Sequence, residues 1–234
     1  MGLKEDLDEE VAETFRSKWE ERDGRDVPDP EDLGLGNDAV KLDGTVLYAD
    51  MSGSTKLVDG HPPFFAAEIY KSYLRCAARI VKAEGGTITA YDGDRIMAVF
   101  VGGSKNTSAA KAALKINYAV INIVNPGIKR VYTSTDYQMA HVIGIDTSAL
   151  FVARIGVRND NDLVWVGRAA NHAAKLTEIS ENNTVFVTGD VFNSLNAEVK
   201  IGGTNKELMW KPRTWTPMEG KAIHSSTWTW KIGS

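Results

Sequence analysis

Residues 87–101 read TITAYDGDRIMAVFV, in which two runs of apolar and β-branched residues flank the dipeptide Asp92-Gly93. Because Asp-Gly tolerates the positive φ values of a tight turn, this stretch predicts a β-hairpin. Before it, residues 45–50 form a short apolar run that predicts a buried strand. Apolar side chains spaced three or four residues apart then predict a helix over 65–80.

After the hairpin, a helix with an apolar face over 109–123 precedes a predicted strand at 138–145. We expect Asn106 or Thr107 to cap this helix, and Asn125-Pro126-Gly127 to end it. The order is therefore β-α-β-β-α-β, the split arrangement of a ferredoxin-like α+β domain. In that arrangement the first strand lies beside the third and antiparallel to it.

The remaining segments extend this unit. Residues 163–167 and 184–188 predict strands, with a helix over 169–179 between them. The stretch 207–232 is rich in tryptophan and threonine, and it predicts extra edge strands at the C-terminus.

The N-terminus carries an apolar stripe in a charged background. Over residues 3–22 an apolar side chain recurs every fourth position, which predicts an amphipathic helix that covers its own domain or a twin subunit. These residues are Leu3, Leu7, Val11, Phe15 and Trp19. Pro28 and Pro30 then disfavour helix. We therefore expect residues 1–40 to be a helix and connector, and 41–234 to be the main domain.

Composition excludes several classes of protein. The 234 residues are 43% hydrophobic and 25% charged, as in an ordinary globular protein, and the net charge of -4 offers no general reason to bind duplex nucleic acid. No apolar run approaches the ~20 residues of a membrane span. Cys76 is the single cysteine, so no internal disulfide can form. We expect a cytoplasmic protein with neither nucleic-acid nor membrane partners.

Carboxylates should converge at one edge of the predicted sheet. Asp50 ends the first strand, and the topology places it beside the hairpin turn that carries Asp92 and Asp94. Taken singly, a strand-end aspartate is often a helix cap and Asp-Gly is often only a turn. Together they predict a site for divalent metal, with backbone N–H groups of the turn at 50–55 available to phosphate.

Three stretches resemble, in the right order, the motifs of the class III nucleotidyl cyclases over roughly residues 44–201. They are Val46 to Thr55, Gly93 to Ala98 and Val166 to Leu176. The resemblance implies a catalytic domain over 41–234 that pairs head to tail as a homodimer with two composite sites. One subunit would hold two Mg²⁺ or Mn²⁺ ions, and the other would supply two catalytic side chains to the nucleoside triphosphate. The residues so implied are Asp50, Met51 and Asp94 for metal, Asn171 and Lys175 for catalysis, and Ser52, Gly53, Ser54 and Thr55 for nucleotide.

Several positions depart from the family pattern. Lys175 stands where the family usually has arginine, which keeps the charge but loses the forked geometry. Ala90 and Val164 occupy the two positions that read a purine through polar side chains. Leaving base edges unpaired in a buried pocket costs ~1–3 kcal/mol per group, so a different base is implied. Tyr91 and backbone groups are candidates for reading a pyrimidine.

These departures, with the segment Gly24 to Pro28, resemble the pyrimidine cyclases of bacterial Pycsar anti-phage defence. The resemblance implies synthesis of cyclic UMP from UTP, or next of cyclic CMP from CTP, as a messenger for a separate effector. A C-terminal cation should bind the triphosphate, and Lys211, Arg213 and Lys221 remain open. Alternatives are an adenylate cyclase with unconventional base recognition and a degenerate nucleotide-binding sensor, against which the retained aspartates argue. The four histidines lack metal-ligand spacing, and we assign them no role.

Overall fold

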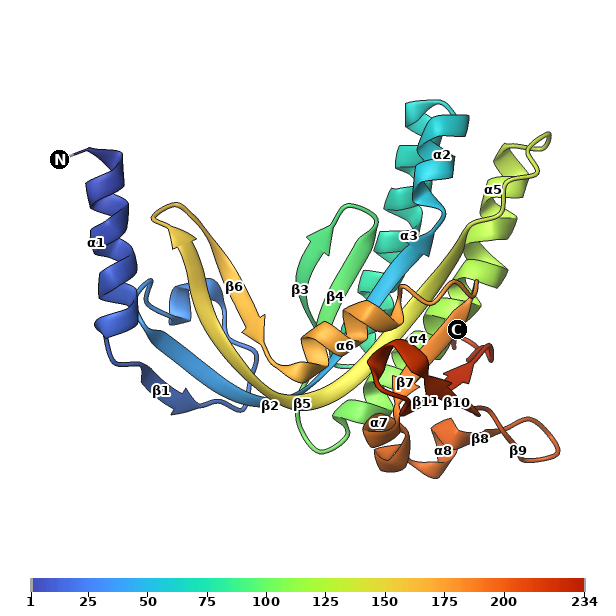
Figure 1. Cartoon of the computed structure of the whole chain (residues 1–234). Coiled ribbons are helices and arrows are strands. Elements are labelled where there is room, and N and C mark those ends of the chain that lie inside the picture. Colours follow the sequence, from blue (N-terminus) through green and yellow to red (C-terminus); the bar gives the residue numbers. More distant parts are fainter. Residues whose placement is uncertain (1, 234) are drawn as a thin grey trace.

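A computed structural model describes residues 2–233, which form a nine-stranded mixed sheet with helices packed against it (Figure 1). The strand order is β10-β11-β7-β5-β2-β4-β3, with β1 added to β2 and β6 added to β5; β8 and β9 pair separately. The strands are β1 (Glu20–Asp23), β2 (Asp38–Ser52), β3 (Thr87–Asp92), β4 (Arg95–Phe100), β5 (Ala140–Val157), β6 (Asp160–Val166), β7 (Thr184–Thr188), β8 (Ile201–Gly202), β9 (Glu207–Leu208), β10 (Lys211–Trp215) and β11 (Lys221–Ser226). The α-helices are α1 (Leu3–Arg16), α2 (Ser54–Gly60), α3 (Pro63–Ala83), α4 (Lys105–Ala119), α5 (Asn125–Val131), α6 (Arg168–Leu176), α7 (Gly189–Ser194) and α8 (Ala197–Lys200).

The predicted β-α-β-β-α-β unit is confirmed as β2, α3, β3, β4, α4 and β5. Strand β2 pairs antiparallel with β4, the third strand of the unit, so that Asp50 lies opposite Arg95. The predicted hairpin turns at Asp92-Gly93, where Gly93 has a φ of 62°. The C-terminal edge strands are present as β10 and β11.

The two faces of the sheet are covered differently. Alternate residues of a strand point to opposite faces, and Leu47 and Ala49 of β2 face a core built with α3 and α4. Val46 of β2 and Met97 of β4 face the other side, where α6 packs through its alanines. Gly144 of β5 permits this close approach, because a Cβ there would lie 2.1 Å from the carbonyl oxygen of Ala173.

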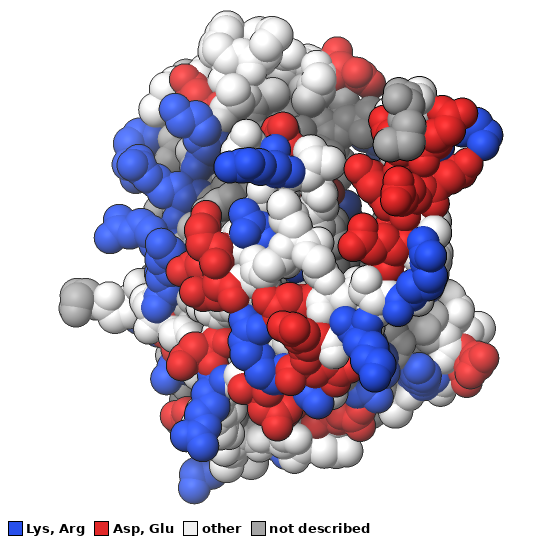
Figure 2. Space-filling view, turned by 90° about the vertical axis from the view of Figure 1, so that its left-hand side faces the viewer, with Lys and Arg blue, Asp and Glu red and all other residues white. Residues whose placement is uncertain are grey.

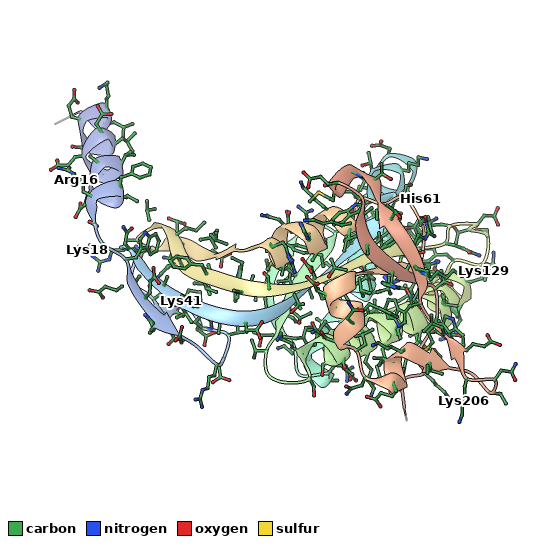
Figure 3. All side chains as sticks on the ribbon, turned by 60° about the horizontal axis from the view of Figure 1, so that its bottom comes forward. Arg16, Lys18, Lys41, His61, Lys129 and Lys206 are labelled. Atoms are coloured by element: carbon green, nitrogen blue, oxygen red, sulfur yellow. The ribbon has the colours of Figure 1, made fainter. Side chains whose placement is uncertain are left out.

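Strands β2 and β5 are much longer than predicted, with 15 and 18 residues. They pair in continuous register and curve away from the body as an arm that carries β1, β6 and α1 at its far end (Figures 1 and 3). Residue 40, the expected domain boundary, lies inside β2. Apolar and polar residues alternate only briefly over 38–44, and charged residues interrupt the pattern. The spacing of apolar residues therefore did not predict that the strand begins as early as residue 38.

The N-terminal helix is shorter than predicted. It ends at Arg16, where the Asn37 side chain donates hydrogen bonds to the carbonyls of Thr14 and Ser17. Trp19 leaves the helix and packs edge-on against Phe151 at 4.9 Å. The apolar stripe of α1 is 49–87% exposed in the single chain, so the helix does not cover its own domain; it comprises Leu3, Leu7, Val11 and Phe15.

The expected stop at Asn125-Pro126-Gly127 is wrong. A π-helical turn, Val120–Val124, joins α4 directly to α5, in which Pro126 occupies the first turn. A proline is tolerated there because the N–H groups of a first turn need no partner within the helix. The helix also begins earlier than expected, with Ser104 as its N-cap.

Surface charge and helix length are the two features that bear on nucleic-acid and membrane partners. Figure 2 looks at the end of the molecule where α1 lies, and it shows basic side chains gathered at the upper left, acidic side chains at the upper right and both interspersed in the lower half. Within residues 2–233, every helix is too short or too polar to cross a membrane.

Candidate active site

The structure brings carboxylates together where β2 meets the β3–β4 hairpin. Asp50 is the last residue of β2 that pairs with β4, opposite Arg95, and Asp94 lies in the hairpin turn one residue before Arg95. Burial, and then the nearby carboxylate of Asp94, raise the pKa of Asp50 to about 6. Arg95 opposes this rise, but its guanidinium is engaged by Asp92, with 2.5 Å between Nη2 and Oδ2.

This donor set fits a divalent cation. Asp50, whose pKa the neighbouring Asp94 carboxylate helps to raise, is stabilised in its charged form when a cation binds between the two side chains. Residues 2–233 hold no cluster of three or more His, Cys, Asp or Glu side chains suited to a metal. Asp50 and Asp94 would therefore hold the ion together with the Met51 backbone and substrate phosphates, as Mg²⁺ commonly does.

A cavity of about 670 Å³ opens beside Asp50. Met51, Ser52 and Gly53 line its wall, while Ser54 and Thr55 begin α2 behind them. Gly53 has a φ of 72°, so a side chain at this position would strain the turn. The opposite wall is the loop after α6, including Glu178 and Asn182. A pocket large enough for a nucleotide therefore lies next to Asp50.

Helix α6 carries Asn171 and Lys175 one turn apart, both exposed. Lys175 lines a second cavity of about 470 Å³, between α6 and the β10–β11 hairpin with Trp215 and Met218. Asp50 lines the first cavity and Lys175 the second. The two cavities adjoin, since both are lined by Glu178 and Ile179, but Asp50 and Lys175 do not line the same one.

The structure distinguishes the three C-terminal cations. Arg213 forms a two-pronged ion pair with Glu181, with Nη2 at 2.7 Å from Oε2. Lys211 is exposed at the start of β10. The Lys221 ammonium reaches α6, where it lies 3.4 Å from His172 Nε2. Lys221 is thus the cation of the three that touches the helix carrying Asn171 and Lys175.

The base-reading positions lie on different parts of the sheet. Ala90, Met97 and Tyr48 form one row across β3, β4 and β2 on the face that carries Asp50. Tyr91 pairs with Ile96, whose side chain belongs to the opposite face. Val164 lies on β6, in the arm. Register thus separates Tyr91 from the row that contains Ala90.

Tyr48 and Arg95 are candidate site residues that the motifs did not single out. The Arg95 guanidinium carbon lies 6.0 Å from the centre of the Tyr48 ring. Burial raises the pKa of the Tyr48 phenol, which therefore stays protonated as a hydrogen-bond donor. The strand period of two, counted back from Asp50, was the available signal.

Comparison with known proteins agrees with this geometry. The model of the adenylate and guanylate cyclase catalytic domain matches residues 41–231, and the chain belongs to that family. A uridylate cyclase of Xanthomonas perforans is 51% identical over 233 residues, covering 99% of this chain and 100% of the relative. A uridylate cyclase of Burkholderia cepacia is 51% identical over 234 residues, with 99% and 100% coverage.

Solved structures support the fold. The adenylyl cyclase CyaB from P. aeruginosa superposes with a TM-score of 0.69 at 18% identity, covering 84% of this chain and 96% of that one. The chain is a nucleotidyl cyclase, a phosphorus–oxygen lyase that acts on a nucleotide substrate. The family generally uses divalent metal ions, in keeping with the paired aspartates.

Proposed function

We propose that this protein is a pyrimidine nucleotide cyclase that converts UTP to 3′,5′-cyclic UMP and pyrophosphate, with CTP as the next substrate. The observation that carries the proposal is 51% identity, over essentially the whole chain, to two proteins named uridylate cyclase. Ala90 supports it, because its methyl group offers no polar contact at a position where a purine reader needs one.

Tyr48 is the candidate that takes over base recognition. It stands in the same cross-strand row as Ala90, on the Asp50 face. Its phenol can donate a hydrogen bond to a pyrimidine carbonyl oxygen. Tyr48→Phe should lower kcat/KM for UTP about tenfold or more, since a buried base edge loses its partner. The ratio of UTP to ATP turnover measures this, and an unchanged ratio would assign base recognition elsewhere.

The chemistry is an in-line displacement that needs no protein nucleophile. The ribose 3′-oxygen attacks the α-phosphorus, a new O–P bond forms, and the bond to the pyrophosphate oxygen breaks. Divalent metal, when bound, would acidify the 3′-hydroxyl and screen the phosphate charges. Asp50 and Asp94 would hold that metal as carboxylates. Asn171, Lys175 and Lys221 would orient the ribose and phosphates and balance the charge that passes to pyrophosphate.

We also propose that two chains pair head to tail, so that each site combines aspartates of one subunit with α6 of the other. Two features support this. Asp50 and Lys175 line different cavities of one chain, and the apolar stripe of α1 is left exposed. Sedimentation should therefore show a dimer in the active preparation, and a fully active monomer would contradict the composite site.

The test of the substrate is incubation of the purified protein with each of the four ribonucleoside triphosphates and Mn²⁺, followed by mass spectrometry. Cyclic UMP should dominate. Cyclic AMP as the main product would establish the adenylate alternative, and the absence of any product would favour a nucleotide-binding sensor. Asp94→Asn is the matched control, because it keeps the shape of the side chain and removes the charge.

Complementation tests the division of labour between subunits. Asp94→Ala and Asn171→Ala should each be inactive as homodimers. In a mixture that exchanges subunits freely, half the dimers are heterodimers with one of two sites intact, so activity should recover to about a quarter of wild type. No recovery despite demonstrated exchange would place both residues in one chain's site.

The biological proposal is that cyclic UMP acts in the cytoplasm as an anti-phage messenger for a separate effector. It is supported by the resemblance to pyrimidine cyclases of Pycsar defence and by the names of the relatives. Cells that express the wild-type protein should accumulate cyclic UMP after infection, and cells with Asp94→Ala should not. Equal phage resistance of the two strains would refute the defence role.

A further inference from the structure

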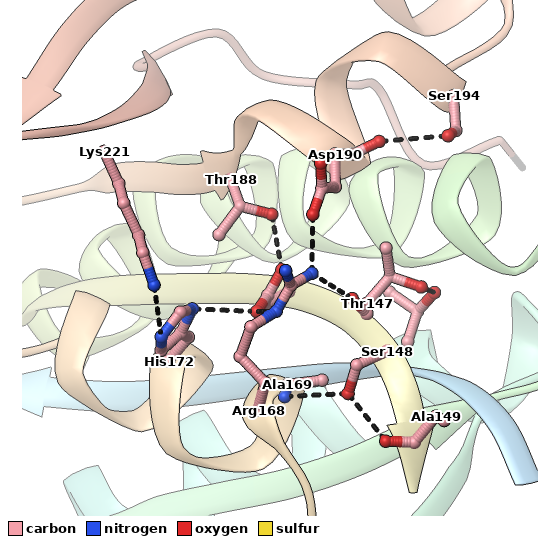
Figure 4. Close-up of polar contacts among 12 residues, drawn as sticks. Thr147, Ser148, Ala149, Arg168, Ala169, His172, Thr188, Asp190, Ser194 and Lys221 are labelled. Atoms are coloured by element: carbon pink, nitrogen blue, oxygen red, sulfur yellow. Dashed lines mark hydrogen bonds and ion pairs between the residues drawn. The ribbon is translucent and has the colours of Figure 1, made fainter. Parts of the chain in front are cut away.

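A buried carboxylate lies beneath α6 and contacts that helix at two points. Asp146 of β5 is fully buried, with no side-chain exposure. Its Oδ1 accepts a hydrogen bond of 2.5 Å from Thr188 at the end of β7. Its Oδ2 lies 3.3 Å from Arg168 Nε and 3.0 Å from His172 Nδ1 (Figure 4).

Arg168 and His172 anchor α6 from its first turn onward. Arg168 begins the helix, and it also binds Asp190 of α7 at 2.6 Å and the Thr147 carbonyl at 2.8 Å. His172 follows Asn171 directly, but its side chain points inward and is 8% exposed. Together with the packed alanines of α6, these contacts to Asp146 fix the rotation of the helix about its axis and hence the direction of Asn171 and Lys175.

The partners of His172 define its tautomer. Asp146 Oδ2 has no hydrogen-bond partner by geometry, but it lies 3.0 Å from Nδ1, and its negative charge favours a proton on that nitrogen. A lysine ammonium only donates, so Nε2 must be the acceptor toward Lys221, 3.4 Å away. A neutral imidazole with its proton on Nδ1 suits both partners. An imidazolium would instead place a second donor, Nε2–H, facing the Lys221 ammonium.

The charges around His172 agree with the neutral form. Burial, then Lys221 from β11 and Arg168 from α6, lower the pKa of His172; Asp146 from β5 acts in the opposite direction. The Trp215 ring of β10 packs edge-on against the His172 ring, with 5.4 Å between the ring centroids.

We propose that Lys221, His172 and Asp146 form a positioning chain for the cyclase reaction, in which neutral His172 both fixes α6 and holds the Lys221 ammonium beside it. His172 is a positioning residue, since it acts through Lys221 and through Asn171 and Lys175. The inference rests on the roles proposed above for Asn171 and Lys175.

Two substitutions at His172 separate its two contacts. Asn reproduces the donor to Asp146 but has no group at the Nε2 position, whereas Gln can place an amide oxygen there to accept from Lys221. His172→Asn should raise the KM for UTP on the order of tenfold, and His172→Gln should raise it less, because small misplacements of positioning groups are costly. His224→Asn is the control: burial lowers the pKa of His224 too, but its ring stacks on Phe192, away from α6.

A double-mutant cycle with Lys221→Ala is the decisive measurement. If His172 acts through Lys221, His172→Asn should cause no further rise in KM in the Lys221→Ala protein. Additive effects, or equal KM values for the Asn and Gln variants, would overturn the proposal. Melting temperatures of all variants show which of them fold.

The tautomer offers a readout on the wild-type protein that requires no folded variant. Ring-nitrogen NMR shifts of the full chain should show His172 as neutral Nδ1–H at pH 7, and an Nε2–H tautomer or an imidazolium would overturn the proposal. Asn171→Ala and Lys175→Ala are assayed in parallel. If both retain full activity, the proposed roles of these residues fail, and the positioning role fails with them even where the tautomer is as expected.

Discussion

His141 is buried in a chain of hydrogen bonds beneath the aspartates, and its protonation should destabilise the fold. Its Nδ1 lies 3.2 Å from the Tyr73 hydroxyl and its Nε2 2.5 Å from Asn117 Oδ1. Asn117 in turn donates to the Trp228 carbonyl at 3.1 Å. A neutral Nε2–H imidazole satisfies every member of this chain. Burial lowers the pKa of His141 to about 3, so the folded protein keeps it neutral under mild acid.

The size of the effect follows from linkage. In the unfolded chain a histidine has a pKa of about 6.5, so between pH 6.5 and 3 the unfolded state binds a proton that the folded state does not. Stability from this group is present above pH 6.5 and is lost as the pH falls. At ~1.36 kcal/mol per pH unit, acidification from pH 7.5 to 5 should cost about 2 kcal/mol through His141.

Urea unfolding of the wild type and of His141→Gln at both pH values measures this quantity. Glutamine cannot be protonated, so the variant should lose about 2 kcal/mol less than the wild type over the same pH change. The comparison between proteins removes the contributions of other groups, including Asp50, whose raised pKa acts in the opposite direction. Equal losses in the two proteins, or titration of His141 near pH 6.5 by NMR, would refute the reasoning.

Three further predictions concern the site and its support. Asp50→Asn should abolish cyclisation without lowering the melting temperature, because it removes a metal ligand and relieves carboxylate repulsion; retained activity would reject the metal assignment. Mn²⁺ affinity in the presence of a non-hydrolysable triphosphate should fall about fivefold between pH 6 and 5 as Asp50 becomes protonated, and calorimetry that finds no change would contradict its pKa of about 6. Gly144→Ala should cost about 1–3 kcal/mol or more and reduce activity by displacing α6, whereas Gly127→Ala, with no atom within 4 Å of the new methyl group, should not destabilise the protein.

The parts of the fold that rest on local chemistry were predictable. Asp92-Gly93 determines a tight turn, and once β3 and β4 form a hairpin, the topology brings Asp94 close to Asp50. Pro126 misled the prediction because a proline ends a helix only where the N–H it lacks is needed. The π-helical turn before it creates a new first turn instead.

Contacts between residues distant in the sequence were not predictable. His172 showed no metal-ligand spacing and was assigned no role, yet it meets Asp146 and Lys221, which stand far from it along the chain. Trp19 continues the four-residue spacing of α1 but leaves the helix to pack on Phe151. The folded sheet brings such residues together, and the spacing of apolar residues along a helix or strand does not predict which residues will meet.

The unbroken pairing of β2 with β5 limits how this protein can change in evolution. Fourteen residue pairs run in one register from Ala39 opposite Ala153 to Ser52 opposite Ala140. Inserting or deleting one residue within either strand would turn every side chain beyond that point to the other face. Such a change in β2 would misdirect Asp50, and one near the start of β5 would misdirect the buried His141 and Asp146. Changes in length should therefore be confined to the turns, such as the one between β5 and β6 at 158–159, while the strands vary only by substitution.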